Sequence, residues 1–349
     1  MTSATQITVL ITAYNYGPFI EQAIESVLTQ DFPTEKVEIV VVDDGSTDDT
    51  GERMKKYGSR VEYFQKANGG QASALNFGFR KARGEIICLM DADDIFLPGK
   101  LRRVAQAFER DAELGLVYHR LQEWHVSTDE RRSWEFVDVS GDLRKEPEKF
   151  ELYVAQPTSA VSFRRSVAEK LLPIPEEIRM LADCYLAALI PFLAPVLAIP
   201  EFLTVYRIHG KNSYTSAEGE IPIETRKNKL KMWQTVTEAM RKWLAEHDFS
   251  GEQQGVKAAT DRWKIIVDRE EFTVTAPGRV RFFAYLLQCY RYGYRLMGWK
   301  LRAINLSNAV GALFLGYKGF HRLDEGREGV TRWARALVSK GSSSPPRWR

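Results

Sequence analysis

The feature that most constrains the fold is a regular alternation, within the first 111 residues, of apolar β-branched runs and segments of helical character. Four runs are predicted to be strands, at 7–14, 37–44, 61–66 and 85–91. Four segments are predicted to be helices, at 17–30, 46–58, 70–84 and 99–111. Because the strands are apolar along most of their length, we expect both faces of the sheet to be covered. The chain should therefore adopt an α/β fold, a mostly parallel sheet with helices on both faces.

Beyond residue 111 the pattern changes twice. From about 112 to 215 it loosens into mixed strands and loops. Beyond about 222 apolar residues recur three or four positions apart, which predicts helices, at Leu230, Trp233, Val236, Met240 and Leu244. We expect one unit with two halves, a helical C-terminal region and a loose tail, at 1–215 (1–97 and 98–215), 216–340 and 341–349.

Composition is that of a globular protein. Of 349 residues, 44% are hydrophobic and 27% charged, and the net charge of +3 is too small to indicate a partner. The cysteines at 88, 184 and 289 are far apart and lack metal-ligand spacing. The first residues have no basic region, and no run of about 18 apolar residues occurs. We therefore expect a cytoplasmic protein.

Polar segments follow three of the predicted strands. They are "TAYNYG", "DDGSTDD" and "DADD". Ligands of open parallel sheets bind beyond the carboxyl ends of the strands, and two carboxylates in Asp-x-Asp can reach one hard metal ion or one ribose. "DADD" alone is better explained as a solvated turn with a helix cap, because short motifs match often by chance. Together the three segments predict a site for a metal ion and a diphosphate.

Four stretches in order resemble the family 2 glycosyltransferases of the GT-A (Rossmann-like) fold, over about the first 215 residues. They are "VLITAYNYGPFIEQAIESVLTQ", "VEIVVVDDGSTDDT", "NGGQASALNFGFRKARGEIICLMDADD" and "IPEFLTVYRIHGKNS". The resemblance implies a nucleotide-sugar donor, a divalent cation (Mn²⁺ or Mg²⁺) and inversion at the anomeric carbon. Residues 1–97 would then bind the nucleotide sugar and residues 98–215 the acceptor.

The resemblance also assigns roles to single residues. The base and ribose would contact Thr12, Ala13 and Tyr14, and also Asp43 or Asp44, between which the doublet leaves the choice open; Asp91 with Ala92 would meet the ribose. Lys66 would place a charge near the nucleotide, or lie solvated at a strand end. Gly69, Gly70 and Gln71 open a helix whose first amides favour polar ligands.

Metal binding and catalysis are expected of other residues. Asp93 would hold the metal ion against the diphosphate, whereas Asp94 would be structural. His209 would ligate the metal or be structural, and Arg207 would meet a phosphate or surface acids. Asp183, in "LADCYLAAL", would be the base that takes the acceptor's proton, or only a helix cap.

Basic and aromatic residues interleave between 279 and 322, a stretch without acids. Such a stretch suits an anionic lipid surface, so peripheral contact with the inner face of a membrane is one expectation. An aromatic core with a solvated basic face explains the spacing slightly better. No nucleic-acid recognition motif is present, so no nucleic-acid partner is expected.

The sequence favours a hexosyltransferase that adds one sugar, from a UDP-sugar as first choice, to a glycan or lipid-linked acceptor of surface-polysaccharide or other glycan synthesis. Two alternatives stay open. A sugar-nucleotidyltransferase would want a glycine-rich basic loop after the first strand, where this chain has "TAYNYGPF". A catalytically degenerate scaffold that only binds nucleotide sugars would keep the same motifs.

Overall fold

The computed structural model describes residues 6–134, 137–210, 212 and 222–293. Within these residues nine strands form one sheet: β1 Ile7–Ala13, β2 Val37–Asp43, β3 Glu62–Gln65, β4 Ile86–Asp91, β5 Ile95–Phe96, β6 Leu116–His125, β7 Glu130–Trp134, β8 Val161–Arg164 and β9 Val196–Ile208. The α-helices described are α1 Gly17–Leu28, α2 Thr50–Met54, α3 Gln71–Lys81, α4 Lys100–Arg110, α5 Arg165–Ala168, α6 Ala182–Leu189, α7 Ile223–Glu246, α8 Gln254–Val274 and α9 Arg279–Gly293.

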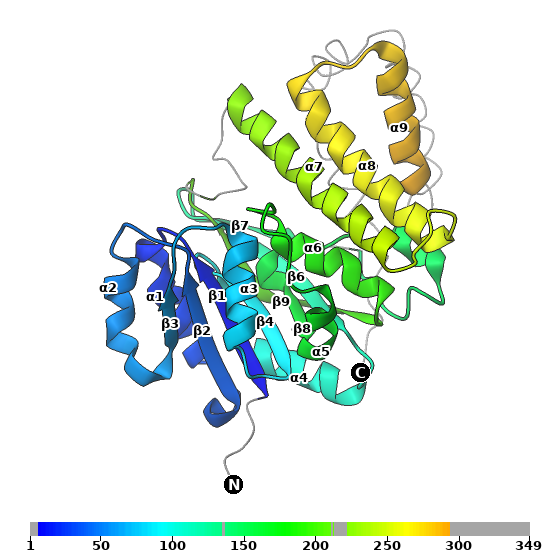
Figure 1. Cartoon of the computed structure of the whole chain (residues 1–349). Coiled ribbons are helices and arrows are strands. Elements are labelled where there is room, and N and C mark those ends of the chain that lie inside the picture. The colour runs from blue at the N-terminus through cyan, green and yellow to red at the C-terminus, as the bar shows by residue number, and fades with distance from the viewer. Residues whose placement is uncertain (1–5, 135–136, 211, 213–221, 294–349) are drawn as a thin grey trace.

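The sheet has the order β3-β2-β1-β4-β8-β6-β9-β5, with β7 paired to β6 (Figure 1). Strands β1 to β4 are mutually parallel, as the strand–helix alternation predicts. From β8 onward the sheet is mixed, because β8 runs antiparallel to β4 and to β6 while β9 runs parallel to β6. The predicted α/β class is confirmed, with this mixed second half as its qualification.

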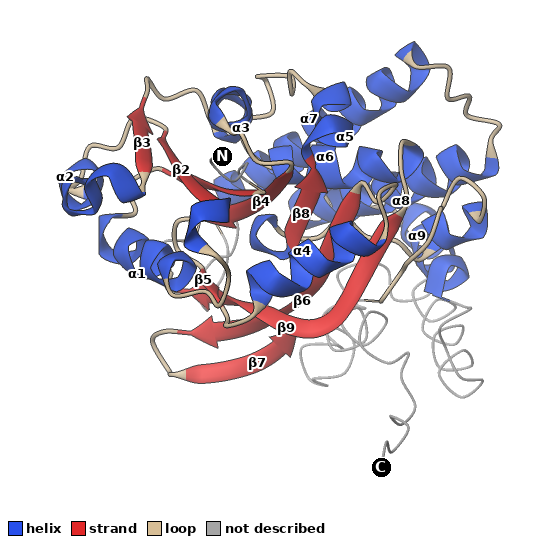
Figure 2. Ribbon diagram, turned by 90° about the horizontal axis from the view of Figure 1, so that it is seen from below, coloured by secondary structure: helices blue, strands red, loops and turns tan. Residues whose placement is uncertain are grey.

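Two apolar cores lie on opposite faces of the sheet. Along β1, Leu10 faces the core that includes α3 and α6, while its neighbours Val9 and Ile11 face the core that includes α1 and α4. Side chains alternate between the two faces of a strand. All three residues are fully buried because a core covers each face. Figure 2 shows the helices on the two sides of the sheet.

The C-terminal helices pack on the α6 side of the molecule. Helices α7 and α8 lie side by side above the sheet (Figure 1), and their buried residues Val236, Met240 and Trp263 join the same core as α6. Helix α9 packs on α8 through Phe272 and Phe282. This accounts for the helical periodicity predicted beyond residue 222.

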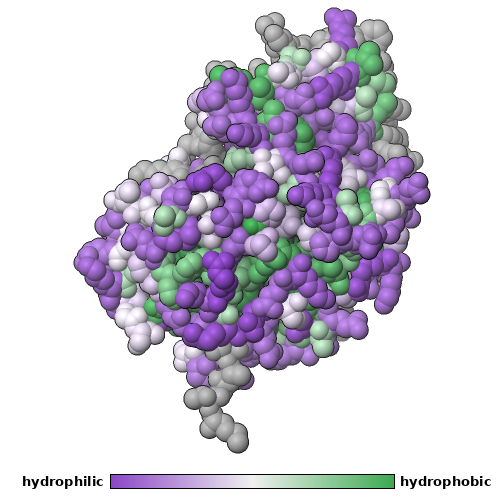
Figure 3. All heavy atoms as spheres, viewed as in Figure 1, coloured by the Kyte–Doolittle hydropathy of each residue, from purple (hydrophilic) through white to green (hydrophobic). Residues whose placement is uncertain are grey.

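Several sequence expectations fall outside the described residues. These include the boundary near 215, the tail 341–349 and, beyond residue 293, the basic-aromatic stretch. The division into units therefore stays a prediction. Within the described part of the chain, no helix combines the length and apolarity that crossing a membrane requires. Hydrophilic residues cover most of the face shown in Figure 3, with hydrophobic ones interspersed over the sheet unit.

Gly84, between α3 and β4, offers a test of this packing. A Cβ there would lie 2.4 Å from the backbone nitrogen of Thr8 and 2.7 Å from the carbonyl carbon of Ile7. Displacing the backbone of β1, a central strand, would cost free energy. We therefore expect Gly84→Ala to lower the free energy of unfolding by about 1–3 kcal/mol in urea denaturation. Gly251→Ala, where nothing lies within 4 Å, should stay within about 0.5 kcal/mol of the parent. Equal effects at both positions would contradict the close approach.

Candidate active site

Three strand ends meet at one edge of the sheet. In the parallel register Thr12 of β1 pairs with Asp91 of β4, and Ala13 pairs with Asp43 of β2. Tyr14 follows directly, and 48% of its surface is exposed. The structure thus brings together the three polar segments that the sequence singled out, with an exposed aromatic ring beside them.

Backbone hydrogen bonds fix these strand ends against one another. The amide of Ala92 donates to the carbonyl of Thr12 at 3.3 Å, and the amide of Asp44 donates to the carbonyl of Ala13 at 2.8 Å. The end of β1 is therefore held between the two acidic segments.

The acidic doublet after β2 has two sets of partners. Asp43 is fully buried and accepts hydrogen bonds from the Tyr63 hydroxyl at 2.5 Å and the Ser46 amide at 2.7 Å. Burial and this contact raise the pKa of Tyr63. Asp44 instead pairs with the ammonium group of Lys66 at 2.7 Å. Both carboxylates are bonded within the protein, so the choice between them as the base contact stays open.

The glycine loop before α3 is also engaged. The amides of Gly69 and Gly70 donate to Asp44 at 2.9 and 2.7 Å, and the amide of Gln71 donates to the carbonyl of Arg179 at 2.8 Å. Gly70 has φ +89°, and a Cβ there would lie 2.7 Å from Arg179 Cα, so only glycine fits. The amides that were expected to face a ligand are instead hydrogen-bonded to Asp44 and to the carbonyl of Arg179. Direct contact of Gly70 and Gln71 with a ligand stays a prediction.

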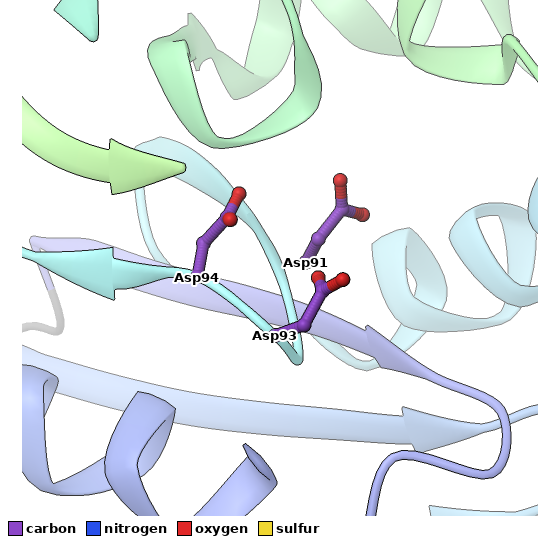
Figure 4. Close-up of side chains that lie close together, drawn as sticks. All are labelled: Asp91, Asp93 and Asp94. Atoms are coloured by element: carbon purple, nitrogen blue, oxygen red, sulfur yellow. The ribbon is translucent and has the colours of Figure 1, made fainter. Parts of the chain in front are cut away.

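The acid turn after β4 gathers Asp91, Asp93 and Asp94. One carboxylate oxygen from each lies within 4.8 Å of the other two. Figure 4 shows the three side chains leaving the same turn. Asp93 and Asp94 are buried, and Asp91 is partly buried.

Burial makes this arrangement costly for ionised carboxylates. Burial, followed by the charges of Asp93 and Asp94, holds the pKa of Asp91 well above its usual range. Burial and the Asp93 charge likewise raise the pKa of Asp94. Both shifts arise from burial and from neighbouring negative charge, and a bound cation would offset both.

The end of β9 brings His209 to the acid turn. His209 Nε2 lies 3.0 Å from Asp93 Oδ2, and Asn212 Nδ2 donates to the same oxygen at 3.1 Å. The His209 ring stacks on Phe19 of α1, with 4.0 Å between ring centroids. The structure therefore places His209 beside Asp93, the two residues expected to bind metal.

Arg207 is an internal clamp rather than a partner of surface acids, so that alternative is wrong, while contact with a phosphate stays a prediction. Only 1% of Arg207 is exposed. Its guanidinium donates to the carbonyls of Asp93 and Phe19 and to the side chain of Gln22. Its backbone amide donates to Asp94 Oδ1 at 3.1 Å. Arg207 thus joins β9, α1 and the acid turn.

The residues present fit a divalent cation. Asp94 Oδ2 is buried and has no hydrogen-bond partner among the described residues. Carboxylate oxygens suit Mg²⁺ and Mn²⁺, and a neighbouring imidazole suits Mn²⁺. Asp93 and His209, with Asp91 or Asp94 adjacent, are the groups that could hold it.

Asp183 lies in the first turn of α6, where only 7% of it is exposed. Thr158, in the short 3₁₀ helix η4 (Thr158–Ala160), donates its hydroxyl to Asp183 Oδ2 at 2.9 Å. Burial raises the pKa of Asp183, which favours a carboxylate that can accept a proton. Its charge also contributes to the raised pKa of Asp91, so the acid turn and Asp183 share one electrostatic environment.

Sequence reasoning missed four residues of this site. Thr158 and Ser159 lie in the 3₁₀ helix η4, where no sequence motif marks them, and the Ser159 hydroxyl accepts the Asp91 amide at 3.0 Å. Gln22 lies on a helix face that reads as solvated. Asn212 stood within the quoted stretch ending "RIHGKNS", so a signal for it was present.

Comparison with known proteins identifies the family of this chain. The sequence model for glycosyl transferase family 2 matches residues 8–172. An uncharacterized glycosyltransferase of Nostoc sp. is 34% identical over 219 residues, which cover 61% of this chain and 67% of the relative. One from Rickettsia typhi is 33% identical over 145 residues, or 38% of this chain and 44% of that protein. The chain belongs to the family 2 glycosyltransferases.

Solved structures show the same fold at low identity. S. aureus TarS 1–349 in complex with UDP-GlcNAc has a TM-score of 0.58 and 16% identity, and covers 93% of this chain and 91% of its own. The mannosyltransferase PcManGT of Pyrobaculum calidifontis, in complex with GDP-Man and Mn²⁺, has a TM-score of 0.54 and 19% identity, with 96% and 85% covered. These likenesses support the GT-A fold.

The raised pKa of Asp91 predicts how stability changes with pH. Between the unfolded pKa, about 3.9, and the higher folded value, the native state binds more protons than the unfolded state, so this residue's cost grows as pH rises. Without divalent metal, we expect Asp91→Asn to match the parent near pH 4 and to melt a few degrees higher at pH 7. Calorimetry across this pH range measures the difference.

Asp142→Asn is the matched control, with the opposite sign. A hydrogen bond from Arg144 lowers the pKa of Asp142, so its ionised form stabilises the fold above the unfolded pKa and this is lost as pH falls through the folded value. Its variant should melt below the parent at pH 7, and the gap should close in acid. An Asp91→Asn curve of that shape would contradict the electrostatic reading of the acid turn.

Proposed function

We propose that the protein transfers one sugar from a nucleotide sugar, UDP-linked as first choice, to an acceptor hydroxyl with inversion and with the help of Mn²⁺ or Mg²⁺. One observation carries this proposal. A cluster of three carboxylates lies at the carboxyl end of β4, and a separate buried carboxylate, Asp183, lies close enough to raise the pKa of Asp91.

The chemistry needs one displacement. The acceptor oxygen forms a bond to the anomeric carbon while the bond from that carbon to the diphosphate oxygen breaks, and the electron pair leaves with the diphosphate. Asp183 takes the acceptor's proton, for which a raised pKa is an advantage. Attack from the face opposite the diphosphate inverts the anomeric carbon.

The donor would lie across the sheet edge. Tyr14 offers an exposed ring for the base, with Thr12 and Ala13 beneath, and Asp43 or Asp44 beside it; Asp91 and Ala92 would meet the ribose. Asp93 and His209 would hold the metal ion, which when bound stabilises negative charge on the leaving diphosphate. Lys66 would place a further positive charge at this end.

The proposal for the particular nucleotide and acceptor rests on the structural neighbours and on what is usual in the family. TarS binds UDP and UDP-GlcNAc, which favours uridine, whereas PcManGT binds GDP-Man. A glycan or lipid-linked acceptor of surface-polysaccharide synthesis, used at the inner face of the membrane, is the proposed context. A sugar-nucleotidyltransferase is disfavoured by the segment after β1, which is "TAYNYGPF".

Donor and metal dependence are tested by thermal-shift screening of UDP-, GDP- and dTDP-sugars with and without Mn²⁺. We expect one nucleotide to raise the melting temperature only when Mn²⁺ is present, because Asp93 and its neighbours would bind the donor through the cation. Asp93→Ala should abolish this gain, and Asp31→Ala, at an exposed site after the C-terminal end of α1, should keep it. A gain of equal size without metal would remove Asp93 from this role.

The role of Asp183 is tested by Asp183→Asn. The amide cannot accept the proton, so we expect release of nucleoside diphosphate to fall by about 10²–10⁴-fold while donor-induced stabilisation persists. Turnover is measured with the nucleotide sugar chosen by the screen, and Asp31→Asn serves as control. Unchanged turnover would favour a different base, whereas donor binding without turnover in the parent would favour a scaffold that only binds.

A further inference from the structure

The 3₁₀ helix η4 lies between the acid turn and α6. Its first residue, Thr158, is 4% exposed and bonds to Asp183, which is 7% exposed. A carboxylate at the end of a short side chain can otherwise rotate about its last bond. This one buried hydroxyl therefore restricts the orientation of the carboxylate that the mechanism uses.

Gln71, the first residue of α3, contacts both the Thr158 hydroxyl and the first residue of α6. Its Nε2 donates to Thr158 Oγ1 at 3.4 Å, and its Oε1 accepts the backbone amide of Ala182 at 2.9 Å. Since Nε2 is a donor, Thr158 Oγ1 accepts there, which leaves its single proton for a carboxylate. Asp183 accepts it at 2.9 Å, and the same hydroxyl also lies near Asp91, whose pKa it lowers in part. The two contacts of Gln71 thus act on Asp183 through its hydroxyl partner and through the first residue of α6.

The backbone before α6 supports the same arrangement. Leu181, at the N-terminal end of α6, has φ +69°, a conformation that costs energy for a residue with a side chain. The Gln71 amide bonds the carbonyl of Arg179, and the Ala72 amide bonds that of Ile178. The start of α3 is therefore fastened to residues 178–182, which lead directly into Asp183.

We propose that Thr158 and Gln71 are positioning residues for the base: Thr158 fixes the carboxylate of Asp183, and Gln71 orients Thr158 while it holds the first turn of α6. The inference rests on the proposed function, in which Asp183 is the base. It gives Gln71 a second role, at the base, beside the donor contact that stays a prediction. Gln71 follows Gly70, which bonds Asp44, so the donor end of α3 and the base share one rigid connection.

Thr158→Val and Thr158→Ser separate positioning from packing. Valine keeps the shape and loses the hydroxyl, and serine keeps the hydroxyl. We expect Thr158→Val to lower kcat by about tenfold to a hundredfold, as loss of a hydrogen bond to a charged group predicts, with the donor KM within about twofold of the parent. Thr158→Ser should stay within about threefold. The probe is release of nucleoside diphosphate, with water as acceptor, from the nucleotide sugar that stabilises the parent most.

Two further variants serve as a second test and as a control. Gln71→Met, which loses both amide contacts, should lower kcat in the same way and remains informative if Thr158→Val does not fold. Thr237→Val removes a buried hydroxyl from α7 that bonds the carbonyl of Trp233, and its kcat should be unchanged.

Three results would overturn the proposal. They are a parental kcat in Thr158→Val and Gln71→Met, an equal loss in Thr158→Ser, or a loss confined to the donor KM. Failure of the proposed function looks different. A parent that neither binds nor turns over any nucleotide sugar would overturn both conclusions, whereas a parent that turns over normally beside an unaffected Thr158→Val would overturn only the positioning role.

Discussion

Repulsion among the carboxylates after β4 is the constraint on which the site depends. Three acids share one turn, and burial holds two of them at raised pKa values. The surroundings hold the turn in place nonetheless. Arg207 bonds the Asp93 carbonyl and the Asp94 side chain, and the Ser159 hydroxyl accepts the Asp91 amide. Beneath them the buried ammonium of Lys100 donates to the Ser159 carbonyl, although burial lowers the pKa of Lys100 to about 7. The protein thus fixes the backbone of a turn whose side chains still favour a cation.

Helix α3 connects this edge of the sheet to the segment that precedes α6. Its first amides and the glycines before them bond Asp44 at one end of the site and the carbonyl of Arg179 at the other. The sequence suggests a helix N-terminus open to anions, a common use of such amides. Here a carboxylate of the protein, Asp44, already accepts the amides of the glycines before the helix, so the start of α3 links the segment after β2 to the segment before α6.

Sequence patterns anticipated the parallel half of the fold because β1, β2 and β4 are continuous apolar runs buried on both faces. They did not anticipate β5 or β7, since β5 has two residues and β7 consists of Glu130–Trp134, which carries four exposed positions. Asp91, Asp93, Asp183 and His209 could be selected because motifs surround them. Thr158 and Arg207 could not be placed, because their roles depend on contacts between residues more than twenty or a hundred positions apart, and no local spacing encodes such contacts.

The separation of Asp183 from the acid turn has a physical consequence. A divalent cation lowers the proton affinity of any carboxylate that it coordinates, so a base within the cluster would lose its function when the metal bound. Asp183 instead comes from helix α6 and accepts a hydrogen bond from a neutral hydroxyl. Burial raises its pKa, and the Thr158 contact opposes this in part without removing it. Under the proposed function, one group of carboxylates would serve the charge and Asp183 the proton, within a single electrostatic environment.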